Sequence, residues 1–242
     1  MSKEIVVYWT GNCNYFGKTG YNWNILYPSP PSLYKDLSIN LNKNNDTPSF
    51  YQCPAFKSVA QNSFVVKNPL SSHYKVIDES NLVSLRDSSM EASIIRKPTL
   101  ENMKIIKYAL SFLAFSEESL VMCVTPPYMH DAHHLNYGSV VPGKFNISKW
   151  FRSFNPEINL KNNVEELSIP ENDPLYYVSF ETEKKIKMVK FEMSEVLGDY
   201  ANTCSKSCLW EPRTSMEKRY DRFISSKAHK TIIKEIKKNV ID

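Results

Sequence analysis

The sequence predicts a mainly β protein with C-terminal helices, an α+β chain whose body is an antiparallel β-sandwich or jelly roll. Two segments, 143–152 and 170–180, alternate apolar and polar residues and are bounded by Pro, Asn or Asp. This pattern is typical of half-buried antiparallel strands joined by tight turns. Other short apolar runs recur about every ten residues, which favours a sandwich or barrel over βαβ units. Beyond Glu192 the apolar period lengthens to three or four residues, which predicts helices.

The expected strands are short and rich in β-branched or aromatic residues. In chain order they cover residues 5–9, 62–69, 74–77, 82–85, 93–95, 105–108, 120–124, 143–152, 170–180 and 185–191. After its first strand, the segment 1–50 is expected to be irregular, because clusters of Gly, Asn and Pro interrupt its apolar runs. Residues 40–48 are polar throughout and are expected to form an exposed loop.

Two helices are expected near the end of the chain. Residues 194–208 form a short one, and residues 214–238 form a longer amphipathic one with apolar side chains at three- and four-residue spacing. The predicted organisation is a β-sandwich domain at 1–192 followed by a helical segment at 193–242. That segment is expected to pack on the sandwich or to extend from it.

Composition places the chain among soluble globular proteins. Of its 242 residues, 42% are apolar and 23% are charged, far from the values of disordered chains. No apolar run approaches the ~20 residues of a membrane span, and the first residues lack a small-residue cleavage site, so a cytosolic product is expected. Lysine outnumbers arginine 24 to 6 and there are 21 Asn, a bias that indicates an A+T-rich genome. The net charge of +4 is too small to argue by itself for nucleic acid.

The cysteines are predicted to be reduced thiols, because they are odd in number and scattered: Cys13, Cys53, Cys123, Cys204 and Cys208. Cys204 and Cys208 lack the two-residue spacing and the second pair of a zinc site, and are interpreted as two cysteines one turn apart on a helix.

The stretch from Gly11 to Thr19 is one residue too long between its glycines for a phosphate-binding P-loop. The sequence therefore assigns no catalytic, cofactor-binding or metal-ligating residue and predicts no cofactor.

A dense group of possible metal ligands occurs at His130, Asp131, His133 and His134. Iron oxygenases with a jelly roll need two His and one carboxylate around an open coordination position. Here His130 is followed directly by Asp131, and adjacent residues on a strand point to opposite faces. A metal site and a solvated polar turn both remain open at this stage, and the spacing favours the turn.

Trp150 and Arg152 allow two interpretations. An Arg beside aromatic rings can grip a carboxylate or phosphate with its planar fork. Alternatively, the two side chains share one strand face, where the Arg stem packs over the ring and the guanidinium pairs with Glu157 or Glu165. The second, structural interpretation is favoured.

The last predicted helix is basic. From Arg213 to Asp242 there are nine Lys or Arg against four acidic residues. Such a stripe could contact nucleic acid, an acidic membrane or an acidic protein. A solvated helix face is the favoured interpretation, because cations near a helix C-terminus also suit its dipole.

The chain resembles an uncharacterised protein family of large tailed phages of marine cyanobacteria, of the myovirus type, with distant bacterial relatives of unknown function. The resemblance rests on residues 53–56 with 62–69, on 142–152 and on 173–180, and it spans about residues 50–240. It implies a bacteriophage product with a jelly-roll or cupin-like body, located in the host cytoplasm or the virion. The family brings no active site that could be carried over.

The sequence therefore favours a non-enzymatic structural or interaction protein, associated with the virion or its assembly. In this hypothesis a β-sandwich presents aromatic-rich loops to protein partners or to further copies of itself. The aromatic residues concerned are Tyr21, Trp23, Tyr27, Tyr34 and Tyr51. Two alternatives remain: a metal-dependent jelly-roll enzyme such as an iron oxygenase, and a nucleic-acid or host-protein binder that uses the basic C-terminal helix.

Overall fold

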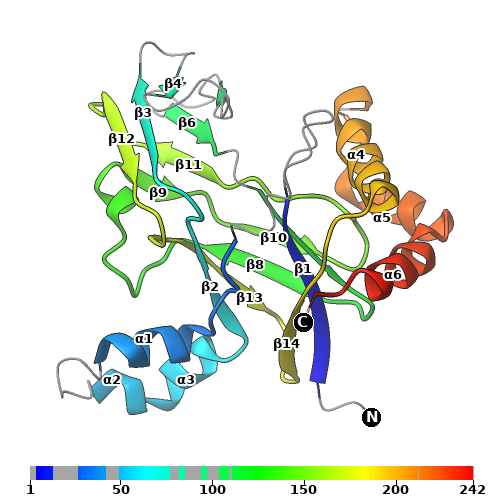
Figure 1. Ribbon diagram of the computed structural model, residues 1–242, viewed down its shortest axis with the longest axis horizontal. Coiled ribbons are helices and arrows are strands. Elements are labelled where there is room, and N and C mark those ends of the chain that lie inside the picture. The colour runs from blue at the N-terminus through cyan, green and yellow to red at the C-terminus, as the bar shows by residue number, and fades with distance from the viewer. Residues whose placement is uncertain are drawn as a thin grey trace.

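The computed structural model describes residues 4–12, 27–41, 49–76, 82–84, 94–96, 104–108, 111–211 and 213–241. In this part of the chain the protein is mainly β, with antiparallel pairing between all strand neighbours except one pair. The sheets occupy the middle of the molecule and helices flank them on two sides (Figure 1). The predicted mainly β fold with C-terminal helices is confirmed, whereas the finer jelly-roll connectivity stays a prediction.

One sheet joins the beginning of the chain to a late strand. Its order is β14 (Lys185–Lys190), β1 (Glu4–Asn12) and β7 (Ser111–Ser116). β1 runs parallel to β14 and antiparallel to β7. The sequence pattern does not reveal this parallel pair, because strands of that kind are connected through long intervening segments rather than a tight turn.

A second sheet is antiparallel throughout. Its order is β10 (Gly143–Asn146), β8 (Val121–Thr125), β13 (Pro174–Phe180) and β2 (Ser63–Lys67). Among the described strands, β10 therefore has one neighbour and lies at the edge. The remaining strands form two sheets. The order in one is β5 (Ile94–Arg96), β6 (Lys104–Lys107), β11 (Glu157–Leu160) and β9 (Gly138–Val140). The order in the other is β12 (Glu166–Ile169), β3 (Ser72–Val76) and β4 (Leu82–Ser84).

The segment predicted as a half-buried strand at 170–180 differs from that prediction. The strand begins only at Pro174, and four consecutive residues, Leu175 to Val178, are buried instead of alternating with exposed ones. The reason is that both faces of β13 are covered. Tyr176 and Val178 belong to the main core, whereas Tyr177 on the opposite face packs in a separate apolar cluster with Leu33.

The face of β13 that carries Tyr177 is covered by helices within the first sixty residues. They are α1 (Leu33–Leu41), α2 (Ser49–Gln52) and α3 (Pro54–Ala60). Part of the segment expected to be irregular is therefore helical, and α1 extends into the tract expected to be a loop; residues 42–48 lie outside the described part. The helices are short, and Pro54 stands in the first turn of α3, where a missing N–H costs nothing. Helices this short leave little periodic signal in a sequence.

The C-terminal helices correspond in part to the prediction. α4 (Glu195–Trp210) begins where expected, with the Ser194 hydroxyl accepting a hydrogen bond from the Leu197 N–H at 3.3 Å. The single helix predicted at 214–238 is wrong, because the chain forms α5 (Met216–Ser225) and α6 (Ala228–Lys238). Between them Lys227 has a φ of 59°, a left-handed conformation that an α-helix cannot continue through.

These three helices pack on the sheet that contains β1. Tyr8, Leu113 and Phe115 of the sheet share an apolar cluster with Phe223 of α5 and Ile232 of α6. The opposite face of the same strands contributes Val7, Trp9 and Phe112 to the main core. The sheet β14–β1–β7 is consequently buried on both faces, and Figure 1 shows α4, α5 and α6 together on one side of it.

Replacing Phe115 by Ala tests this packing. The Phe115 ring is fully buried and makes edge contacts with the rings of Phe151 and Phe223, at 5.1 and 6.2 Å between centroids. We expect Phe115→Ala to lower the free energy of unfolding by about 3–5 kcal/mol, because a large cavity opens between sheet and helices. Urea denaturation followed by circular dichroism measures the change.

The control is Ile224→Ala on α5, where the side chain is 49% exposed. This substitution is expected to change the free energy of unfolding by no more than about 0.5 kcal/mol. Equal effects of the two substitutions would show that α5 does not pack on the sheet through the face that carries Phe223.

Candidate binding cleft

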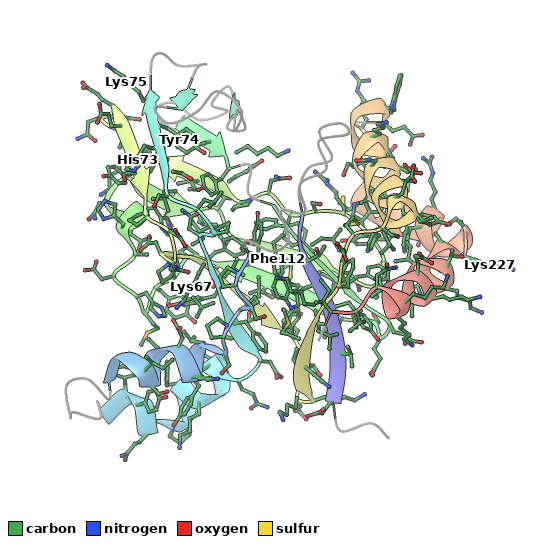
Figure 2. The ribbon with its side chains drawn as sticks, viewed as in Figure 1. Lys67, His73, Tyr74, Lys75, Phe112 and Lys227 are labelled. Carbon is green, nitrogen blue, oxygen red and sulfur yellow. The ribbon has the colours of Figure 1, made fainter. Side chains whose placement is uncertain are left out.

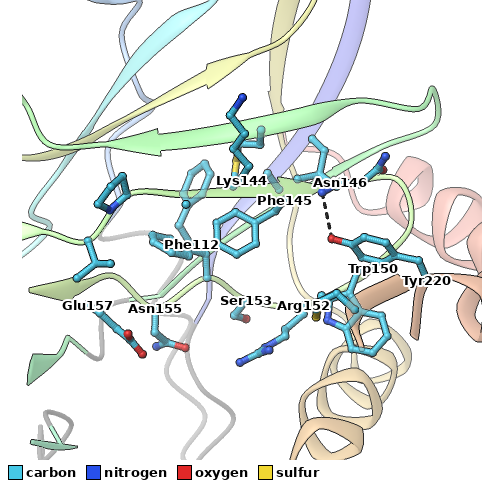
Figure 3. Close-up of a pocket in the computed structure, with 18 of the residues that line it drawn as sticks. Phe112, Lys144, Phe145, Asn146, Trp150, Arg152, Ser153, Asn155, Glu157 and Tyr220 are labelled. Carbon is cyan, nitrogen blue, oxygen red and sulfur yellow. Dashed lines mark hydrogen bonds between the residues drawn. The ribbon is translucent and has the colours of Figure 1, made fainter. Parts of the chain in front are cut away.

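A cleft of about 550 Å³ lies beside the edge strand β10. Residues 141–147 form one side and residues 152–157 the other, with β7 contributing the floor and α5 reaching in from the helical side (Figure 3). Five aromatic side chains line it: Phe112, Phe145, Trp150, Phe154 and Tyr220. The volume and the aromatic lining are typical of ligand pockets, which measure about 300–1,000 Å³.

The strand predicted at 143–152 ends early, and this forms the cleft. The side-chain oxygen Oδ1 of Asn146 accepts hydrogen bonds from the backbone N–H of Ser148 at 3.2 Å and from its hydroxyl at 2.7 Å. This Asx-type turn competes with strand continuation and redirects the chain. Trp150 and Arg152 therefore lie outside any strand, yet both line the cleft.

The far wall is held against β7 by backbone hydrogen bonds. Phe112 and Phe154 exchange N–H···O bonds of 2.8 and 2.7 Å in an isolated bridge. The Phe154 ring then contacts the Phe145 ring of β10 at 5.3 Å and the Tyr176 ring of β13 at 5.5 Å. Aromatic contacts thus join the two walls across the cleft floor.

The sequence pattern indicates Trp150 and Arg152 as candidate site residues but not the other aromatic residues of the cleft. Phe112, Phe154 and Tyr220 come from segments far apart in the sequence, and none belongs to a recognisable motif. The available signal is the pair of aromatic residues interrupted by polar ones at 151–156, which is compatible with ordinary core packing. Only the fold brings these side chains together.

The polar lining has more positive than negative groups. Lys107, Lys144 and Arg152 line the cleft together with one carboxylate, Glu157. Arg152 and Glu157 are thus in the same cleft, as the pairing hypothesis requires, whereas Glu165 does not line it.

Lys144 forms an exposed ion pair with Glu181. The hydrogen bond between them raises the pKa of the Lys144 ammonium and lowers the pKa of the Glu181 carboxyl. Because both groups are solvent-exposed, this pair contributes little to stability.

A second, smaller cavity of about 370 Å³ lies among the C-terminal helices. Trp150 lines both hollows, and its ring centroid lies 6.3 Å from that of Tyr220 and 6.5 Å from that of Phe223. The Trp150 indole Nε1–H is buried and has no hydrogen-bond partner among the described residues. A buried donor of this kind is costly and is stabilised by any acceptor that reaches it.

The structure separates the His130–His134 cluster. His130 Nε2 lies 3.0 Å from Asp36 Oδ2, and its Nδ1 lies 2.5 Å from the hydroxyl of Tyr177. His134 is fully buried, with Nδ1 3.7 Å from a carboxylate oxygen of Asp173. Within the described ranges, no three His, Cys, Asp or Glu side chains come close enough to hold a metal ion. His130 instead belongs to a polar network that docks α1 on β13.

Asp36 is the centre of that network. Its second oxygen, Oδ1, accepts a hydrogen bond from Lys67 Nζ at 2.7 Å, and the side chain is almost fully buried. Burial alone raises the pKa of Asp36, but the hydrogen bonds from His130 and Lys67 outweigh it and hold this pKa below its usual value. Burial also raises the pKa of Tyr177, so its phenol stays protonated and can donate to His130.

The basic C-terminal stripe is partly neutralised. Lys237 pairs with Glu117 and Lys238 with Glu235, each at 2.8 Å. Lys227 lies at the outer end of the helical group, away from the sheets (Figure 2). The two ion pairs account for Lys237 and Lys238, so no bound ligand is needed to explain these cations.

The aromatic residues expected in loops have different environments. Tyr27 and Tyr51 are buried, and Tyr34 lies on helix α1, where its ring stacks on that of Tyr51 at 4.2 Å. Tyr21 and Trp23 lie outside the described residues. The aromatic residues that gather around an open space are instead those of the cleft.

Cys53, Cys123 and Cys204 form no disulfide among the described residues. Cys204 and Cys208 both lie on α4, as interpreted from their spacing. In the part of the chain that the structure covers, the helices are too short or too polar to cross a membrane. Compared with protein-family models and with curated proteins, the chain matches none of them.

Replacing Asp36 by Asn tests the polar network. We expect a free energy of unfolding about 1–3 kcal/mol lower at neutral pH, because Lys67 and His130 lose their charged acceptor. The folded pKa of Asp36 is below the unfolded one, so its stabilising effect exists above the unfolded pKa and disappears as pH falls through the folded one. The difference between native protein and variant should therefore shrink progressively as the pH falls below about 5 and through the folded pKa of Asp36.

Urea denaturation at several pH values measures this difference. A control, Asp221→Asn, changes an exposed carboxylate on α5 and is expected to leave stability nearly unchanged. A gap between native protein and Asp36→Asn that stays constant down to the lowest pH would contradict the proposed role of the carboxylate.

Proposed function

We propose that this protein is a non-enzymatic interaction protein and that the cleft beside β10 is where it binds its partner. The observation that carries the proposal is the lining of the cleft, in which five aromatic side chains from separate segments surround a space of about 550 Å³. Aromatic residues and Arg are enriched at the centres of interfaces, where they supply most of the binding energy.

The lining also defines the chemistry of the bound group. An apolar or aromatic side chain can pack on the rings of Phe112, Phe145 and Phe154, and an anionic group of the same ligand can reach Lys107 or Arg152. A guanidinium binds a carboxylate through paired, charge-assisted hydrogen bonds that are stronger than neutral ones. The preferred ligand is therefore apolar with a negative charge.

The resemblance to a tailed-phage family supplies a biological context for this proposal. For a product of such a phage, other proteins of the virion or of its assembly are candidate partners. We therefore extend the proposal to a protein of virion assembly, with another phage protein as the occupant of the cleft.

The cleft is tested by titration with naphthoate, a small aromatic carboxylate, followed by calorimetry. We expect one saturable site per chain and, in Arg152→Met, a dissociation constant at least about tenfold larger, because a charged hydrogen-bond donor is removed. The matched control is Lys149→Met, which removes a cation of the same segment that does not line the cleft, and it should leave affinity unchanged.

Equal weakening by both substitutions would mean that only general charge attraction is involved. Absence of saturable naphthoate binding to the native protein would overturn the proposed role of the cleft. Circular dichroism of each variant establishes that the fold is retained.

A further inference from the structure

The edge strand β10 presents backbone hydrogen-bonding groups to the cleft. In an antiparallel pair, residues alternate between bonding to the neighbouring strand and pointing away from it. The Ile147 N–H donates to the Leu120 carbonyl at 3.0 Å, at the end of the pairing between β10 and β8. Counting back by two, the backbone N–H and C=O of Phe145 also bond to β8, opposite Met122. The backbone N–H and C=O of Lys144 and Asn146 point away from β8.

Independent hydrogen bonds agree with this alternation. On the other side of β8, the Glu181 N–H donates to the Val121 carbonyl at 3.0 Å, so the odd-numbered residues of β8 bond to β13 and the even-numbered ones to β10. The Asn146 N–H points away from β8 and donates to the Tyr220 hydroxyl at 3.3 Å (Figure 3). Since Tyr220 lines the cleft, backbone groups of β10 that point away from β8 point toward the cleft.

The backbone of Lys144 therefore offers one N–H and one C=O toward the cleft. Asn146 is occupied on this side, because Tyr220 accepts from its N–H and the Lys149 N–H donates to its carbonyl at 3.3 Å. Pro142, on the other flank, has no N–H. The open edge is thus limited to a single residue that can form one complete hydrogen-bonded pair with another strand.

We propose that the partner enters the cleft as an extended peptide segment that adds to β10 as a further strand, pairing with both backbone groups of Lys144. This inference rests on the proposed function and specifies its binding mode. Strand addition gains affinity from main-chain hydrogen bonds, and specificity from pockets that receive alternate side chains. Because Pro142 and the turn at Asn146 limit the pairing to one residue, the register of the incoming segment is fixed.

Charge complementarity selects the sequence of the segment. Side chains of an extended peptide alternate between two faces. Those on the inner face meet the rings of Phe112 and Phe154, which favours apolar residues. The residue opposite Lys144 lies on the other face, beside the Lys144 side chain, and Lys107 and Arg152 also line the cleft together with the one carboxylate of the lining, Glu157, so an acidic residue is favoured at this position. The segment is therefore one in which apolar and acidic residues alternate.

The binding mode is tested with a fluorescein-labelled, blocked heptapeptide in which phenylalanine alternates with glutamate. Variants of this peptide carry one backbone N-methyl group each, which removes a single N–H and keeps every side chain. Fluorescence anisotropy should show that methylation of the residue opposite Lys144 weakens binding at least about tenfold. Methylation of the residues directly before and after it should have little effect, because their N–H groups face away from β10.

The complementary test changes the protein. Lys144→Pro removes the outward N–H but no hydrogen bond to β8, and proline is accepted at such positions of edge strands. Lys144→Met is its matched control, because both variants lose the side-chain charge and the pair with Glu181. We expect the peptide affinity of Lys144→Pro to be at least about tenfold below that of Lys144→Met.

The outcomes separate the binding mode from the proposed function. Strand addition is wrong if no N-methyl group weakens peptide binding, or if Lys144→Pro and Lys144→Met bind the peptide equally. If the native protein still binds naphthoate in that case, the cleft remains a ligand-binding site. If the peptide does not bind although naphthoate does, the occupant is not an extended segment. If neither binds, the proposed function itself fails.

Discussion

Burial of the β14–β1–β7 sheet on both faces determines where the helices and the cleft lie. Successive residues of β7 serve different layers, with Phe112 in the main core and Phe115 against the C-terminal helices. The same strand therefore fixes the floor of the cleft and the position of α5, whose Tyr220 reaches the cleft. Apolar packing on the two faces, rather than any catalytic arrangement, decides where the aromatic side chains meet.

The cleft exists because the chain leaves the sheet at Asn146. Its side chain forms a local turn that is incompatible with a longer strand, so the next residues cross to the helices and return along β7 as the segment around Phe154. The crossing leaves β10 without a second strand neighbour among the described strands. The unpaired backbone groups of an edge strand can pair with another strand. Because β10 is short and follows a proline, few of its groups can do so.

The sequence predicts the fold class well, because periods of two and of three to four residues are local properties that report which face of an element is buried. It also places the start of α4 through Ser194. It misses the break at Lys227, since Lys has no marked preference for the left-handed region, and it misses α1 and α3, which are too short to show a period. The cleft depends on tertiary contacts between distant segments, which no local pattern contains.

In the proposed binding mode, the Lys144 backbone is open in the free protein and paired in the complex. Hydrogen exchange measured by NMR tests it most directly, because the amide of Phe145 is bonded within the sheet and provides an internal reference. We expect the Lys144 amide to exchange much faster than that of Phe145, and saturation with the alternating peptide to slow it. Equal protection of both amides in the free protein, or no slowing at Lys144 on saturation, would contradict it.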